Sequence, residues 1–129
     1  MDIILVTVAC AVLFGLVPVI KAHLDGPKHF TACRLNLMRI GTALEMYCVD
    51  NCNRYPTTLN QLVPRYLSAI PTCPAADADT YSSGFSSAGF ASASVSDCYT
   101  VVCRGYHHYH VGEARNFPQY RSTWVVDEM

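Results

Sequence analysis

Charged side chains are scarce in this chain, and almost none of them lie near its start. Only 15% of the 129 residues are charged, against about 25% in an average soluble domain. Of the ten acidic and nine basic residues, Asp2 alone falls within the first 20 positions. Positions 21–129 therefore carry nine charges of each sign, and this balance excludes a strongly basic nucleic-acid binder. The length fits one domain.

The motifs that usually accompany catalysis are also missing. The sequence has no GxSxG, HExxH or P-loop pattern, which are the arrangements expected of common hydrolases, metalloproteases and nucleotide-binding enzymes. It has no CxxC pair, which disfavours a zinc ribbon, and no CxxCH, which disfavours covalently attached haem. We therefore predict that the protein is not an enzyme.

The first apolar run is long enough for a membrane helix. Ile3–Ile20 is interrupted only by Thr7, Gly15 and Pro18, and as a helix it would measure about 27 Å, close to the thickness of a bilayer core. No basic residue precedes the run, and it is longer than the apolar part of most signal peptides. We expect a retained transmembrane and assembly helix over residues 1–22, with a cleaved signal peptide as the alternative, and an extracytoplasmic domain over 23–129.

The orientation of this helix presents a conflict. The first basic residues, beginning with Lys21 and Lys28, follow the apolar run, and the positive-inside rule would then keep the domain in the cytoplasm. The many cysteines instead favour an oxidising compartment. A basic segment upstream of Met1 would remove the conflict.

A second helix is indicated after a break. Asp25-Gly26-Pro27 is expected to break or kink the helix. Helical spacing then resumes over Pro27 to about Val49, where the apolar stripe is Cys33, Leu37, Ile40, Leu44 and Tyr47. The residues at 50–53 favour turns and end it.

The rest of the chain reads as a short helix, a loop and a small sheet. Thr58 and Gln61 have the spacing of a capping box, which predicts a short helix through Leu59, Leu62 and Val63. Residues 73–96 are rich in small and polar residues and predict an irregular segment. Residues 98–103 and 106–111 predict a hairpin, and 124–126 a third strand. The expected fold is α+β.

This order of elements, with these residues, resembles the type IV pilin and pseudopilin superfamily, and is most similar to the major pseudopilin of type II secretion systems. The resemblance is carried by Ile40-Gly41-Thr42-Ala43-Leu44-Glu45-Met46-Tyr47, then Asp50-Asn51, then Arg54-Tyr55-Pro56-Thr57, and by the apolar run ending in Val17-Pro18. It implies a long N-terminal helix, half in the membrane and half amphipathic, packed on a small antiparallel sheet. It also implies a structural subunit in the inner membrane whose C-terminal domain is periplasmic or extracellular.

In such a subunit the apolar helix is also the assembly surface. The residues that we expect to pack against other subunits are Leu5, Val8, Val12, Leu16 and Val19. The implied partners are other copies of the chain in a filament, other pilin-like subunits, inner-membrane components of a secretion system and membrane lipid, with no nucleic acid. Prepilins carry a basic leader and a glutamate early in the mature helix. Neither is present here. Three explanations are open: the numbering begins inside the helix, the start is assigned too late, or the chain is not processed. Asp2 is the candidate to replace the glutamate.

Six cysteines follow the apolar run. They allow 15 disulfide pairings, among which the sequence does not choose. Disulfides are the favoured state, with free thiols and a metal site as alternatives. Cys10, within the run, is read as a small apolar residue. The disulfide candidates are Cys33, Cys48, Cys52, Cys73, Cys98 and Cys103.

The segment Tyr106-His107-His108-Tyr109-His110 is unusual. On a strand, His108 and His110 would share one face, and such a pair can hold zinc or copper. An exposed strand without any ligand is the alternative, and it is favoured. The resembling pseudopilins carry calcium in their C-terminal loops, and the resemblance gives calcium as the only cofactor candidate, with oxygen ligands drawn from Asp77, Asp79, Asp97 and Glu113.

Two functions therefore stay open. The favoured one is a pilin-like structural subunit that assembles through its N-terminal helix into a type IV pilus or a type II secretion pseudopilus. The alternative is a membrane-anchored extracytoplasmic module that binds a metal or another ligand through the histidine-rich segment.

Overall fold

The computed structural model describes residues 2–88 and 98–122. Within these ranges, the side chains at positions 2–11, 13, 19, 22, 23, 88 and 110 are not described. The elements in chain order are one long helix, a 3-10 turn, a second 3-10 turn leading into two strands, a third 3-10 turn and a last strand. The fold is α+β, as the sequence predicts.

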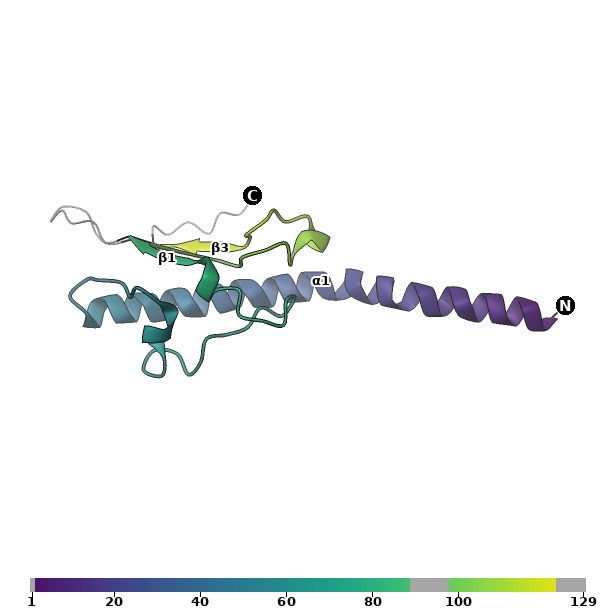
Figure 1. The fold of residues 1–129 in the computed structure, drawn as a ribbon, viewed down its shortest axis with the longest axis horizontal. Coiled ribbons are helices and arrows are strands. Elements are labelled where there is room, and N and C mark those ends of the chain that lie inside the picture. The colour runs from purple at the N-terminus through teal and green to yellow at the C-terminus, as the bar shows by residue number, and fades with distance from the viewer. Residues whose placement is uncertain (1, 89–97, 123–129) are drawn as a thin grey trace.

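Helix α1 (Asp2–Asp50) dominates the molecule. It contains 49 residues without interruption, which corresponds to about 74 Å of helix. The sheet and the segment after α1 lie along its C-terminal half, while the N-terminal half projects beyond them (Figure 1). Of the expected break or kink at 25–27, the break is wrong, because α1 runs through both Pro18 and Pro27. A proline inside a helix removes one backbone hydrogen bond and bends the helix, but the bonds on either side are kept.

The apolar stripe predicted for this helix is confirmed as its buried face. Cys33, Ile40 and Leu44 are fully buried, Leu37 is nearly so, and Tyr47 is half-buried against the same core. These positions follow the 3.6-residue period of a helix. The stripe packs against residues of the sheet and of the intervening loop, namely Leu59, Leu62, Tyr81, Tyr99 and Val101.

The predicted short helix is confirmed as the 3-10 turn η1 (Leu59–Leu62). The Gln61 side chain accepts hydrogen bonds from the backbone N–H groups of Thr57 at 2.7 Å and Thr58 at 3.3 Å. The side chain thereby satisfies donors at the start of the turn that have no partner within it. Leu59 and Leu62 are both buried, so η1 places two apolar side chains in the core.

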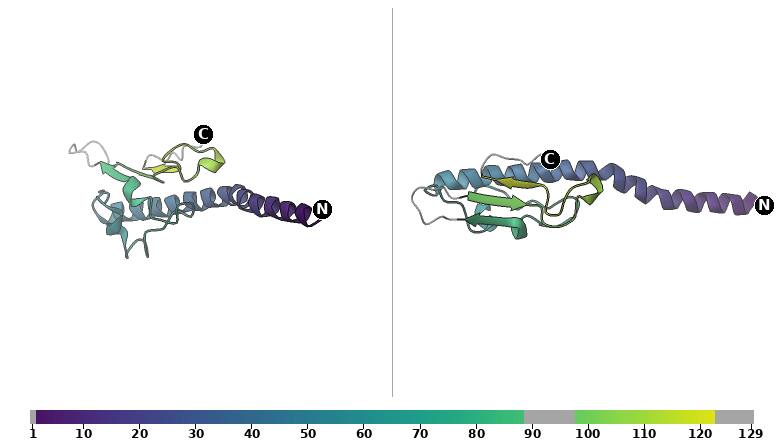
Figure 2. Two further views of the ribbon diagram at one scale, coloured as in Figure 1. Left: turned by 45° about the vertical axis from the view of Figure 1, so that its right-hand side comes forward. Right: turned by 90° about the horizontal axis from the view of Figure 1, so that it is seen from above.

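The sheet has three antiparallel strands in the order β1 (Phe85–Ala88), β2 (Cys98–Val102) and β3 (Gln119–Arg121). Val101 lies opposite Phe85 on one side and Tyr120 on the other. Seen from above, the strands run along the C-terminal half of α1 (Figure 2). Strand β1 lies inside the segment 73–96 that we predicted to be irregular, so this prediction is wrong for 85–88.

The predicted hairpin between 98–103 and 106–111 is also wrong. Residues 109–111 form the 3-10 turn η3 (Tyr109–Val111) instead of a strand, and β2 pairs with β1 and β3. The reason is a contact across the loop: the Gly105 N–H donates to Asn116 Oδ1 at 2.9 Å, and the Asn116 N–H donates to the Gly105 carbonyl at 2.8 Å. The third strand predicted at 124–126 lies outside the described residues.

The projecting half of α1 presents apolar side chains to solvent. Phe14 is 81% exposed and Leu24 is 62% exposed, and the same holds for several neighbours, namely Val12, Leu16, Val17 and Ile20. In the part of the chain that the structure describes, no helix has the length and apolar character needed to cross a membrane.

Candidate metal centre

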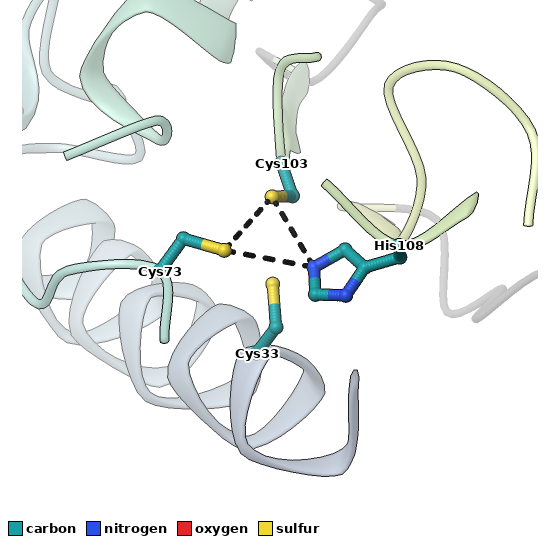
Figure 3. Close-up of side chains that lie close together, drawn as sticks. All are labelled: Cys33, Cys73, Cys103 and His108. Atoms are coloured by element: carbon teal, nitrogen blue, oxygen red, sulfur yellow. Dashed lines mark hydrogen bonds between the residues drawn. The ribbon is translucent and has the colours of Figure 1, made fainter. Parts of the chain in front are cut away.

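Four metal-ligating side chains meet in the core where α1, the loop after it and the sheet come together. They are Cys33, Cys73, Cys103 and His108, which we call the four-ligand cluster. Their sulfur and nitrogen atoms all lie within 4.8 Å of one another, and all four residues are buried. Figure 3 shows the four side chains pointing toward a common centre from four different segments.

Cys33 and Cys73 reach the cluster from a helix and a tight turn. Cys33 lies on the buried stripe of α1, so its place follows from helical periodicity. Cys73 begins a turn in which its N–H donates to the Ala78 carbonyl at 2.8 Å and its carbonyl accepts from the N–H of Asp77 at 2.8 Å. Asp77 has a φ of 50°, a left-handed conformation that aspartate tolerates better than most residues.

Cys103 and His108 come from the end of the sheet. Cys103 follows β2 directly, and its N–H donates to the Pro118 carbonyl at 2.9 Å, which extends the contact between β2 and the chain before β3. His108 lies in the loop that Gly105 and Asn116 close. The ring of Phe30 on α1 packs edge-on against the His108 ring, with centroids 5.5 Å apart. Each ligand is therefore fixed by its own backbone and packing contacts.

Three of the six distances within the cluster, those that do not involve Cys33, are close to those of a tetrahedral metal site, and all six are within 4.8 Å. The Sγ atoms of Cys73 and Cys103 are 3.5 Å apart, and His108 Nε2 lies 3.6 Å from each of them. Ligands about 2.3 Å (sulfur) and 2.0–2.1 Å (nitrogen) from a tetrahedral zinc would be about 3.8 Å apart for two sulfurs and about 3.5 Å for sulfur and nitrogen. The observed edges agree with these values within a few tenths of an ångström.

Two hydroxyl groups lie next to two of the cluster's sulfur atoms. The Tyr81 hydroxyl donates to Cys33 Sγ at 3.2 Å, and the Thr80 hydroxyl lies 3.2 Å from Cys103 Sγ. Both residues are buried. Hydrogen bonds to ligand sulfurs spread the negative charge of a metal thiolate and hold the ligand in place.

The hydrogen bonds within the cluster shift the pKa values of three of its side chains. Hydrogen bonds from Cys103 and Cys33 lower the pKa of the Cys73 thiol, while the bonds with Cys103 and Cys73, together with burial, raise the pKa of the Cys33 thiol. Burial disfavours the charged ring of His108, but the bonds with Cys103 and Cys73 outweigh it and raise the pKa of His108 to about 9. The cluster therefore favours a thiolate at Cys73 beside a protonated imidazole.

The structure brings together three of the six cysteines that we named as disulfide candidates. Cys33, Cys73 and Cys103 meet in the cluster, whereas Cys48, Cys52 and Cys98 lie elsewhere, and no disulfide joins any two of the six. Cys52 is exposed, and Cys48 and Cys98 are half-buried.

The remaining metal candidates do not join a site in the described ranges. Outside the cluster, these ranges hold no other group of three or more histidine, cysteine or acidic side chains suited to a metal ion. The Asp79 carboxylate accepts the N–H groups of Tyr81 and Ser82, both at 2.9 Å. Asp77 and Glu113 lie in loops. Asp97 falls outside the described residues, and the His110 side chain does as well.

Of the five predicted assembly residues, two have described side chains. Val12 is 54% exposed and Leu16 is 47% exposed. The side chains of Leu5, Val8 and Val19 lie outside the described residues, so their part in assembly stays a prediction.

Sequence reasoning found one ligand of the cluster, His108, but paired it with His110. It named the three cysteines as disulfide candidates but did not predict that they meet, because they are separated by 40 and 30 positions in the sequence. The usable signal was the helical stripe, which places Cys33 on the buried face of α1. A buried thiol beside a histidine-rich loop is the combination that indicates a metal site.

Comparisons of this chain with protein families, with curated proteins and with solved structures give no match.

Proposed function

We propose that this protein is a pilin-like structural subunit, anchored in the inner membrane by its N-terminal helix and assembling through that helix into a type IV pilus or a type II secretion pseudopilus. The observation that supports the proposal most directly is the division of α1. Its C-terminal half packs one apolar face against the rest of the α+β fold, and its N-terminal half projects beyond the fold and carries exposed apolar residues such as Phe14 and Leu24.

An exposed apolar surface of this kind needs a partner. Single exposed apolar residues are common on soluble proteins, but a continuous patch marks a site of interaction. In the proposed subunit the patch faces lipid before assembly and other subunits afterwards, so assembly exchanges one apolar environment for another. Packing shape then determines specificity. The uncharged run Ile3–Ile20 supports the membrane location.

The test of this proposal is the recovery of filaments from cells. We expect shear fractions from cells that express the chain with its native upstream sequence to contain filaments visible by electron microscopy. Leu16→Glu should abolish them, because it places a charge on the apolar assembly surface. Immunoblotting of membrane fractions checks that the variant is still produced.

Ser68→Glu is the matched control, because it adds the same charge at an exposed position of the domain. It should leave the filaments unchanged. A chain that stays monomeric in the membrane, with no filament and no co-purifying pilin-like partner, would falsify the proposal.

A second candidate function, an anchored metal-binding module, is favoured by the four-ligand cluster. The cluster is buried, and it offers four protein ligands rather than three with an open position. This arrangement suits a metal that holds the domain together better than one that binds an external ligand. The two functions are therefore compatible: the filament assay tests assembly, and metal analysis tests metal binding.

A further inference from the structure

We propose that Cys33, Cys73, Cys103 and His108 bind one zinc ion, which joins the sheet and the connecting loop to α1. The proposal goes beyond the filament function and does not depend on it. It rests on the composition of the cluster, its geometry, its burial and the segments that it connects.

The chemical types of the four side chains indicate which metal they bind. Three thiolates and one imidazole are soft or intermediate ligands, which favour zinc over calcium or magnesium. The cluster has no carboxylate or carbonyl ligand of the kind that calcium requires. Zinc also has no redox chemistry of its own, which fits a site with a structural role.

The geometry selects a closed site. Three of the distances between ligand atoms, 3.5 Å and twice 3.6 Å, agree with the edges of a tetrahedron around zinc. With four protein ligands, no coordination position is left for water or substrate, and such zinc sites are structural. The hydroxyls of Tyr81 and Thr80 provide the outer hydrogen bonds that such sites normally have.

The arrangement is less suited to a disulfide. A bond between Cys73 and Cys103 would consume two of the ligands, and the buried His108 would lose the two thiols that lie 3.6 Å from its Nε2. Buried polar groups that lose their partners are costly. One zinc ion uses all four side chains at once.

A cavity lies next to the site. Its volume is about 480 Å³, it lies between α1 and the loop that carries His108, and His29, His107 and His108 are among the residues that line it. Imidazole groups along this cavity are themselves able to bind zinc transiently. His108 is the one ligand that reaches both the cavity and the cluster.

The four ligands come from α1, the turn at 73–78, the end of β2 and the loop at 104–116. A single ion therefore connects four separate segments around the core. This domain is small, and small domains often depend on a metal or on disulfides because their cores are limited. Zinc binding would therefore stabilise the folded domain.

The test is metal analysis of the full chain purified in detergent under reducing conditions. We expect one zinc per chain by elemental mass spectrometry. Replacement of zinc by cobalt should give the intense visible absorption of a tetrahedral site and a sulfur-to-cobalt charge-transfer band. An absence of bound zinc and cobalt, or the weak spectrum of octahedral cobalt, overturns the proposal, and this result needs no variant.

Variants then assign the ligands. Cys33→Ser should weaken zinc binding by about 100-fold or more, although it leaves Cys73 and Cys103 in place. Cys52→Ser is the matched control, because Cys52 is an exposed thiol outside the cluster, and it should bind zinc like the unchanged chain. If Cys33→Ser binds zinc with unchanged affinity, or if peptide mapping of the chain isolated without reductant, with its thiols alkylated at lysis, finds a Cys73–Cys103 disulfide, the proposal is wrong.

Discussion

At the scale of single residues, two tyrosine hydroxyl groups share one carboxylate as their hydrogen-bond acceptor. The Tyr99 hydroxyl donates to Glu45 Oε1 at 3.1 Å, and the Tyr55 hydroxyl donates to Glu45 Oε2 at 2.9 Å. The rings of Tyr55 and Tyr99 also pack edge to face at 4.7 Å. Glu45 therefore links α1 to β2 and to the turn at 55–57 through both of its oxygens.

Burial and the Glu45 charge raise the pKa of Tyr99 well above its usual value of about 10. The folded chain therefore keeps the Tyr99 proton at a pH where the unfolded chain loses it. This contribution to stability is fully present below about pH 10 and is lost as the pH rises from there toward the folded-state pKa. We expect the free energy of unfolding to fall as the pH is raised from 9 to 11.

Tyr99→Phe tests this expectation. It should lower the free energy of unfolding at pH 8 by about 1 kcal/mol, through the lost hydrogen bond, and make its decrease between pH 9 and 11 shallower. Urea unfolding of both chains at each pH, followed by circular dichroism, provides the measurement. Equal slopes for the two chains would contradict the assignment.

At the scale of elements, the contact between α1 and β3 is unusually close at Gly41. A Cβ added to Gly41 would lie 2.5 Å from Cε1 and 2.8 Å from Cδ1 of Tyr120. The ring of Tyr120 stacks on that of Tyr99, with centroids 6.3 Å apart. Glycine at this position therefore lets β3 approach the helix.

Gly41→Ala should destabilise the protein even though alanine is the better helix former. The helix itself would gain about 1 kcal/mol, but displacement of the Tyr120 ring should cost about 1–3 kcal/mol. We expect a lower urea midpoint. Gly15→Ala is the matched control in the same helix, because nothing lies within 4 Å of its added Cβ. A midpoint that rises in Gly41→Ala would show that the ring moves freely.

Elements with a local pattern were predictable from the sequence, and elements decided by distant contacts were not. The buried stripe from Cys33 to Tyr47 follows from spacing within one helix, and the turn at Leu59 follows from Thr58 and Gln61. The segment at 106–111 has the residues of a strand, but the pairing of Gly105 with Asn116 closes it into a loop. Tertiary context overrode local preference there.

The candidate metal centre shows the same limit more strongly. No local motif brings Cys33, Cys73 and Cys103 together, and the missing CxxC spacing favoured disulfides instead. Only the packing of the turn at 73–78 and of the end of β2 onto α1 creates the common centre. A sequence pattern records which ligands are available, and the fold determines which of them meet.

At the scale of the whole molecule, the proposed zinc would couple the domain to the helix. Removal of the metal with a strong chelator should loosen the sheet from the C-terminal half of α1. We expect amide hydrogen exchange in β2 to become at least about 10-fold faster, since it would then occur from a less stable domain. Exchange in the projecting half of α1, which supplies none of the four cluster residues, should not change.

Hydrogen exchange with mass spectrometry provides this measurement on the full chain in detergent. The Cys33→Ser chain should exchange at the fast rate with or without the chelator. If the chelator leaves β2 unchanged in the native chain, the metal has no role in holding the sheet to α1.

The order of the four ligands along the chain has a consequence for biogenesis. The first ligand lies at position 33 and the last at 108. A growing or translocating chain therefore offers at most two of the three cluster cysteines until residue 103 has emerged. Two thiols alone bind zinc weakly, and closing the loops between distant ligands carries an entropic cost. Metal capture is therefore a late event, completed in the compartment where the end of the domain arrives. The zinc supply of that compartment would then limit how much of the protein reaches its mature form.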